Sequence, residues 1–113
     1  MTARLAAKVE VSGLIRIVEG RGGSAAVLAR GDAEAGAILL FLADRGAPWG
    51  FLERALDPSG AYHWRRTGPT DASDSEEVAH YVARRRRIDS DMWVVELDVA
   101  GVERFADEMT AKG

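Results

Sequence analysis

The feature of this sequence that most limits its fold is an unbroken apolar run, Ala37 to Ala43 (AILLFLA). The run is far shorter than the roughly 20 apolar residues that a membrane-spanning helix needs. A short apolar run between turn residues is typical of a central strand that is covered on both faces. We therefore expect a sheet with helices packed on at least one side, and no membrane span.

Local patterns predict further elements on both sides of this run. Apolar residues alternate along Leu5 to Val11, which predicts a half-buried strand. Ser12 can then cap a short helix that ends at Gly20 and the glycines after it. An amphipathic helix is predicted from a capping Ser73 to the arginines that end at Arg87. Further strands are predicted over residues 25–30, 49–56, 61–67 and 92–99, and a closing helix over residues 102–109.

Together these elements predict an α+β fold. We expect a single domain over residues 1–113, with a mostly antiparallel sheet of about five or six strands and about two or three helices packed on it. Alternation along the last strand places Trp93 on its buried face, where we expect the indole to pack against Phe105 or Val82.

Composition narrows the setting of the protein. The chain has no cysteine, which excludes disulfide frameworks and thiolate metal sites and fits the cytoplasm. Its first residues lack the apolar segment of a signal peptide. A net charge of -3 is not typical of a nucleic-acid-binding domain. We expect a cytoplasmic protein with no metal, no cofactor and no membrane partner.

The strongest charge feature is the run Arg84, Arg85, Arg86 and Arg87 at the end of a predicted helix. One interpretation is a phosphate or RNA contact, helped by the rings and guanidinium groups of the predicted strand 61–67. The other is a helix end whose cations offset the helix dipole and pair with nearby acids such as Asp89 or Asp91. Acids on both sides of the run weaken its attraction for phosphate, so we expect no specific nucleic-acid binding.

Three patterns bear on catalysis. The two histidines, His63 and His80, form none of the metal-binding motifs H-x-x-E-H, H-E-x-x-H and H-x-H. Glu96 and Asp98 share one face of a predicted strand, where they can act as an acid and a base or lie on an exposed sheet edge. A Ser/His/acid triad assembled from distant residues also stays open, because its members need not be adjacent.

The residues Gly20 to Ala25 fit G-x-G-x-x-A, the looser form of the dinucleotide-binding fingerprint. A dinucleotide-binding domain needs two halves, and this chain is too short for both. We therefore interpret these glycines as the end of a helix.

Several short motifs together resemble a known family. They are T-x-R-L at Thr2 to Leu5, L-I-R-x-x-E-x-x-G-G from Leu14 to Gly23, A-x-V-L-x-R-G-D from Ala25 to Asp32, A-G-A-I-L from Ala35 to Leu39, R-R-x-D-x-D-x-W-V-V-E-L from Arg86 to Leu97, and E-R-F at Glu103 to Phe105. On these motifs the chain is similar to the small alphaproteobacterial proteins known as domain of unknown function 1491. The resemblance implies a single-domain bacterial protein with no assigned activity.

For function we expect a non-enzymatic binding or interaction module that self-associates. Three short helices give little cover to so apolar a strand, and a homodimer in which a sheet edge such as 61–67 or 92–98 pairs with its copy would add cover. Two alternatives stay open. One is a weak RNA or phosphate binder that uses Arg84 to Arg87, and the other is a small hydrolase with a site assembled from scattered polar residues.

Overall fold

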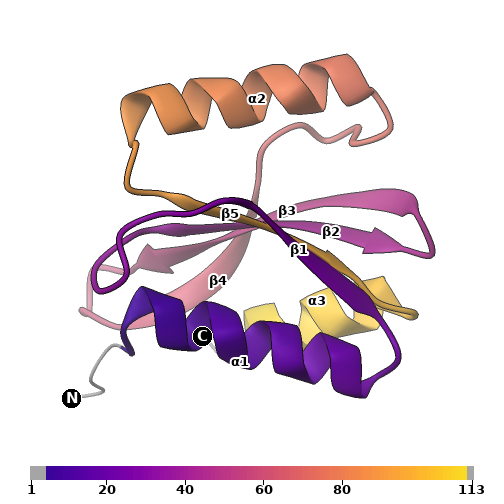
Figure 1. Ribbon diagram of the computed structural model, residues 1–113, viewed down its shortest axis with the longest axis horizontal. Helices are drawn as coiled ribbons and strands as arrows, with labels where there is room; N and C mark the ends of the chain where they lie inside the picture. The colour runs from indigo at the N-terminus through magenta and orange to yellow at the C-terminus, as the bar shows by residue number, and fades with distance from the viewer. Residues whose placement is uncertain (1–4, 112–113) are drawn as a thin grey trace.

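The computed structural model describes residues 5–111, so Thr2 to Arg4 of the first family-like motif lie outside the described residues. The elements in chain order are α1 (Ala7–Gly20), β1 (Ser24–Ala29), β2 (Ile38–Asp44), β3 (Ala47–Leu56), β4 (Tyr62–Thr67), α2 (Ser75–Ile88), β5 (Trp93–Asp98) and α3 (Val102–Ala111). Figure 1 shows three layers, with α2 on one face of the sheet and α1 and α3 on the other. None of the described helices is long and apolar enough to cross a membrane.

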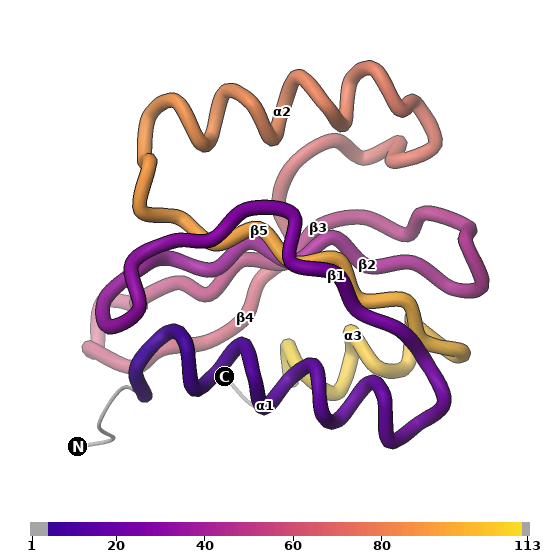
Figure 2. The backbone as a smooth tube through the Cα atoms, in the orientation of Figure 1, coloured from indigo at the N-terminus to yellow at the C-terminus, as the bar shows by residue number. Residues whose placement is uncertain are grey.

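The sheet has five strands in the order β1-β5-β2-β3-β4. Strands β2 and β5 run parallel, and the other neighbouring pairs are antiparallel. The parallel pair arises because the chain leaves β4, passes through α2 above the sheet and returns as β5, a path that Figure 2 traces. The predicted α+β fold with a mostly antiparallel sheet is confirmed.

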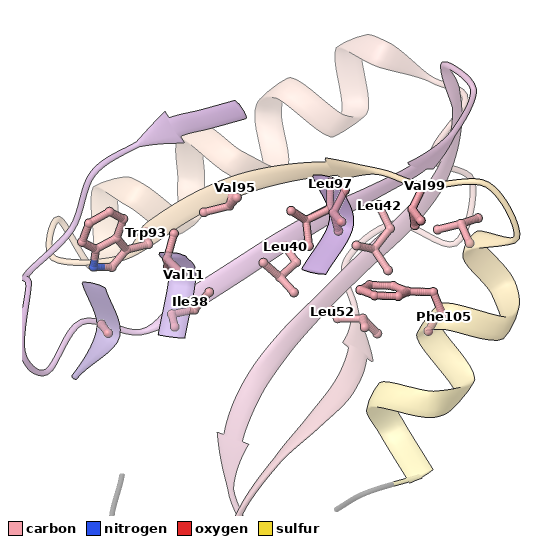
Figure 3. Packing of buried hydrophobic residues seen from close by; sticks show 14 residues of the cluster. Val11, Ile38, Leu40, Leu42, Leu52, Trp93, Val95, Leu97, Val99 and Phe105 are labelled. Atoms are coloured by element: carbon pink, nitrogen blue, oxygen red, sulfur yellow. The ribbon is translucent and has the colours of Figure 1, made fainter. Parts of the chain in front are cut away.

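Strand β2 lies in the middle of the sheet, as its apolar run predicts. Its alternate side chains divide between two cores. Leu39 packs with Phe51 and Tyr81 on the face covered by α2. Leu40 and Leu42 belong to the larger core, on the face covered by α1 and α3 (Figure 3). Because both faces are covered, the strand is apolar at nearly every position.

Trp93 is buried as predicted, with 3% of its surface exposed, but its contacts differ from the expected ones. Figure 3 shows Trp93 and Phe105 at opposite ends of the larger core, and Val82 belongs to the other core. The indole Nε1 instead donates a hydrogen bond to the Asp32 carbonyl oxygen at 2.8 Å. A Cβ at Gly31 would lie only 2.7 Å from the indole Cδ1, so the connection between β1 and β2 packs directly on the ring. The reason is that Trp93 begins β5, at the end of the sheet where this connection passes.

The strand predicted for Leu5 to Val11 is wrong, because this stretch enters α1, which runs on to Gly20. Ala7, Val11 and Val18 are buried at helical spacing, and Lys8 is on the exposed side. Over so few residues the same apolar positions fit both periods. Packing of the helix against β1 and β5 decides between them.

Two further expectations need correction. The predicted edge 92–98 is an interior strand, β5, because the crossover through α2 inserts it between β1 and β2. The edges are therefore β1 and β4.

At the start of α2 the cap is Asp74 rather than Ser73, and its carboxylate accepts hydrogen bonds from the N–H groups of Glu76 and Glu77. A charged acceptor suits a helix N-terminus better than a hydroxyl, and the Ser73 hydroxyl donates to Asp71 instead.

Candidate functional site

An open apolar groove of 440 Å³ runs between α2 and the sheet. We call it the α2 groove. Its helix wall is formed by small and branched side chains, and its floor by residues of four strands. The residues that line it are Leu28, Phe41, Pro48, Ala72, Ser73, Ser75, Val78, Ala79, Val82, Ala83 and Glu96. A groove of this size with mostly apolar walls and few polar groups is typical of a small-molecule site.

The sequence of α2 explains why the groove exists. On the β3 side of the helix, Tyr81 is buried and its ring lies 5.0 Å from that of Phe51. On the β1 side, Ala79 and Ala83 have only a methyl group each, at a spacing of one helical turn. The helix is therefore supported along one side and leaves space along the other. The sequence shows the spacing of the two alanines, but it does not show which strands lie opposite them.

Glu96 carries the one charge among the described residues that line the α2 groove. Its partners in the sheet are Ala26 in β1 and Phe41 in β2, both of which are apolar. The carboxylate is half-buried and makes no hydrogen bond or ion pair with another residue of the described part of the chain. A half-buried carboxylate without a protein partner is available to a ligand that carries a positive charge.

Asp98, two residues further along the same face, is already occupied. Its carboxylate accepts the N–H groups of Arg45 at 2.7 Å and Gly46 at 2.8 Å, and so holds the turn between β2 and β3. Both turn residues have positive φ, 52° and 84°, and the two bonds stabilise that conformation. Glu96 and Asp98 therefore do not form an acid–base pair. The alternative, an exposed sheet edge, is also wrong because β5 is interior.

The four arginines at the end of α2 separate into two pairs. Arg84 and Arg87 are exposed, whereas Arg85 and Arg86 are directed into the molecule. Arg86 donates to the Met92 carbonyl oxygen at 2.7 Å and to the Ser90 carbonyl oxygen, which ties the helix end to the start of β5. Of the four arginines, the alternative of a phosphate contact is thus left with the two exposed guanidinium groups of Arg84 and Arg87.

Arg85 binds Glu53, on the face of the sheet that α2 covers, rather than Asp89 or Asp91. Its Nη2 lies 2.6 Å from Glu53 Oε2, and its Nη1 donates to the Tyr81 hydroxyl at 2.6 Å. Arg65 reaches the other carboxylate oxygen at 3.2 Å. Partial burial raises the pKa of Glu53, but the hydrogen bonds and charges of Arg85 and Arg65 outweigh it and hold that pKa below its ordinary value of 4.5.

The structure brings a serine, a histidine and an aspartate together at the turn between β3 and β4. Ser59 Oγ donates to Asp57 Oδ1 at 2.5 Å, and His63 Nδ1 lies 3.7 Å from Asp57 Oδ2. In a hydrolytic triad the serine donates to the imidazole instead. Asp57 also accepts the N–H groups of Ser59 and Ala61, so the cluster stabilises a turn and does not activate the serine.

The remaining candidate residues have structural surroundings. Gly20 is the last residue of α1, and Gly22 has a φ of 82°, as expected for glycines that end a helix. His80 is exposed on α2. Among residues 5–111, no three or more histidine and acidic side chains gather where they could hold a metal ion.

A family model described as "Protein of unknown function (DUF1491)" matches residues 5–107. A crystal structure of a DUF1491 family protein from Caulobacter crescentus CB15 is 33% identical, with a TM-score of 0.73 over 84% of this chain and 88% of that chain. An NMR structure of a DUF1491 family protein from Caulobacter crescentus CB15 is 32% identical, with a TM-score of 0.73 over 88% of this chain and 89% of that chain.

A solution structure of a protein from A. tumefaciens is also similar. It is 32% identical, with a TM-score of 0.61 over 86% of this chain and 87% of that chain. None of the curated proteins compared with the chain matches it.

Proposed function

This chain belongs to the DUF1491 family, whose description assigns no function, and we propose that it is a non-enzymatic binding module that acts in the cytoplasm as a homodimer. We assign the binding to the α2 groove. The ligand class is a small amphiphilic cation, with an apolar body in the groove and an ammonium or similar group at Glu96.

The observation that carries this proposal is the Glu96 carboxylate, which has no partner among the described residues and stands between Ala26 and Phe41. The groove walls offer the apolar body of a ligand a surface of valine, alanine and phenylalanine side chains. A cationic group at Glu96 would form a charge-assisted hydrogen bond, which is roughly twice as strong as a neutral one. Charge and shape together therefore favour a cation over an anion of the same length.

A single ionisable group in the groove lining supports binding rather than catalysis. General acid–base chemistry needs groups within reach of the reacting atoms that give and take protons. Asp98 accepts a hydrogen bond from the turn after β2, and Ser59 donates one to Asp57 at the turn between β3 and β4. Neither residue therefore supplies a second proton-transfer group beside Glu96.

The test is a titration of ¹⁵N-labelled protein, followed by NMR, with three probes of equal chain length: octylammonium, octanol and octanoate. We expect the amide chemical-shift changes caused by the bound probes to centre on Phe41, Val78 and Glu96. Octylammonium should bind about tenfold more tightly than octanol, the amount expected for one hydrogen bond to a charged group, and octanoate should bind least. Probes that leave the groove amides unmoved, or octanoate binding equal to that of octylammonium, would contradict the proposal.

Glu96→Gln isolates the charge, because it keeps the size of the side chain. We expect this variant to bind octanol as the wild type does and to lose the preference for octylammonium. Glu103→Gln is the matched control, because Glu103 is an exposed carboxylate on α3, across the sheet from the groove. It should leave the preference intact.

A further inference from the structure

The two edges of the sheet differ in charge. Strand β4 has the sequence YHWRRT, with Arg65 and Arg66 and a histidine. Strand β1 has the sequence SAAVLA, with no charged residue and no proline. Edge strands normally carry charges or prolines that prevent pairing with another chain. A register shift between Val27 and Ala29 interrupts the far end of β1, and Ser24 to Val27 pair regularly with β5. The regular part of β1 is thus an edge with no charged residue or proline to prevent pairing with another strand.

Apolar side chains are exposed on both faces at this edge. Val27 is 42% exposed on the face that carries α1, and Leu28 is 54% exposed beside the α2 groove. A strand added to β1 would cover both side chains and pair the outward N–H and C=O groups of the edge. The unpaired backbone groups of β1 and its exposed apolar side chains therefore both favour the addition of another strand.

Helix α1 presents a matching stripe beneath this edge. Lys8, Ser12 and Ile15 line a hollow of 300 Å³ together with Val27. Glu19 continues the line, because positions 8, 12, 15 and 19 follow helical spacing. We call these four residues the α1 stripe. Lys8 and Glu19 are exposed at its two ends, and neither side chain forms an ion pair with a residue of the described range 5–111.

The stripe is complementary to itself under a two-fold rotation. If β1 pairs with a second β1 about an axis normal to the sheet, the two α1 helices lie antiparallel on the same side. Helix α1 packs on both β1 and β5, so its axis lies about half a strand spacing behind β1. The two paired β1 strands are themselves about 4.8 Å apart. The two helix axes are therefore about 10 Å apart, which is a normal packing distance. Reversal of the stripe then sets Lys8 against Glu19 of the partner subunit, and Ser12 against Ile15 of the partner subunit.

We infer that the occupant of this surface is a second copy of the chain, and that the dimer forms through β1 and the α1 stripe. This inference rests on the homodimer in the proposed function and assigns it a surface. It does not require the ligand assigned to the α2 groove, although Leu28 contributes to both surfaces. Opposite charges at the two ends of one stripe select an antiparallel copy of the same helix, because that arrangement pairs each charge with its opposite.

Charge reversal tests the surface. Lys8→Glu faces the Glu19 carboxylate of the partner subunit, and Glu19→Lys faces the Lys8 ammonium of the partner subunit. We expect each single variant to raise the dimer dissociation constant about tenfold, measured by sedimentation equilibrium. The double variant Lys8→Glu with Glu19→Lys restores opposite charges and should return the constant to the wild-type range. Both changes also favour the helix dipole, so loss of folding does not explain a weakened dimer.

A control variant and two further outcomes separate failure of the assigned surface from failure of the homodimer itself. Asp107→Lys changes an exposed charge on α3, on the same side of the sheet but away from β1, and should have no effect. A wild-type mass that stays at 12.2 kDa at all concentrations would overturn the proposed homodimer itself. A dimer of twice that mass that neither single reversal weakens would overturn the surface alone. Hydrogen exchange should also protect the amides of β1 in the dimer, and protection of β4 instead would contradict the assignment.

Discussion

At the scale of single residues, Trp93 joins segments that lie far apart in the chain. Its ring packs under the connection between β1 and β2, its Nε1 donates to the Asp32 carbonyl oxygen, and Arg30 lies over its face at 5.6 Å. The larger core holds the other side of the residue. One side chain thus fastens the connection between β1 and β2 to the start of β5.

Replacement of Trp93 separates its two contributions. We expect Trp93→Ala to lower the free energy of unfolding by roughly 3 to 5 kcal/mol, because a large cavity is left in the core. Trp93→Phe keeps most of the apolar contact and loses the hydrogen bond to Asp32, so its cost should be clearly smaller. Urea denaturation followed by circular dichroism measures both. An alanine variant with the wild-type midpoint would show that the ring is not part of the core.

At the scale of elements, α2 has little apolar surface to hold it. Tyr81 is its one buried residue among those described, and Val78 and Val82 are half-buried. Polar contacts at the two ends therefore matter more than in α1. Asp74 satisfies the first N–H groups, and Arg86 binds carbonyl oxygens beyond the last turn.

The cap of α2 gives a prediction at this scale. Asp74→Ala removes the acceptor for the Glu76 and Glu77 N–H groups and should lower the free energy of unfolding by about 1 kcal/mol. Ser73→Ala, one residue earlier, removes a hydroxyl that contacts Asp71 on the surface, and should cost less than about 0.5 kcal/mol. Thermal or urea unfolding compares the two variants. Equal effects would mean that Asp74 does not act as the cap.

At the scale of the whole molecule, Glu53 links three elements that are separate in sequence. It lies in β3, and it binds Arg85 of α2 and Arg65 of β4. Tyr81 and Thr67 extend the same network through a hydrogen bond of 3.1 Å. This network fixes α2 over the β3 side of the sheet and so leaves the α2 groove on the β1 side.

The network predicts how stability depends on pH. The pKa of Glu53 is lower in the folded chain than its ordinary value of 4.5, so the folded state favours the ionised carboxylate. Its contribution is complete above that ordinary value and is lost as the pH falls through the folded value. We expect wild type to exceed Glu53→Gln in free energy of unfolding at pH 7, and the difference to shrink below about pH 4.5.

Urea titrations at a series of pH values measure this difference. Glu103→Gln serves as the control, since Glu103 is exposed and forms no ion pair with a described residue. Its difference from wild type should stay small at every pH. A Glu53→Gln difference that does not change between pH 7 and strong acid would show that the ion pairs do not stabilise the fold.

Local sequence patterns are sufficient to show which segments are buried and on how many faces. The apolar run in β2, the helical spacing of α2 and α3 and the burial of Trp93 all follow from local periodicity. Periodicity reports whether a side chain leaves water, and that depends on neighbours within a few residues. For the same reason the strand predicted for Leu5 to Val11 is wrong, because over so few residues the same apolar positions fit both a strand and a helix.

Which segments meet depends on long-range contacts that the folded chain alone reveals. The insertion of β5 between β1 and β2 made β1 an edge, set Trp93 under a connection rather than beside Phe105, and placed Glu96 in an apolar groove. It also turned Arg85 and Arg86 inward, although all four arginines look alike in sequence. The hydrophobic effect that drives burial is non-directional, so local patterns carry no information on the partner. Partners are chosen by long-range strand pairing, and in this chain that choice created both proposed binding surfaces.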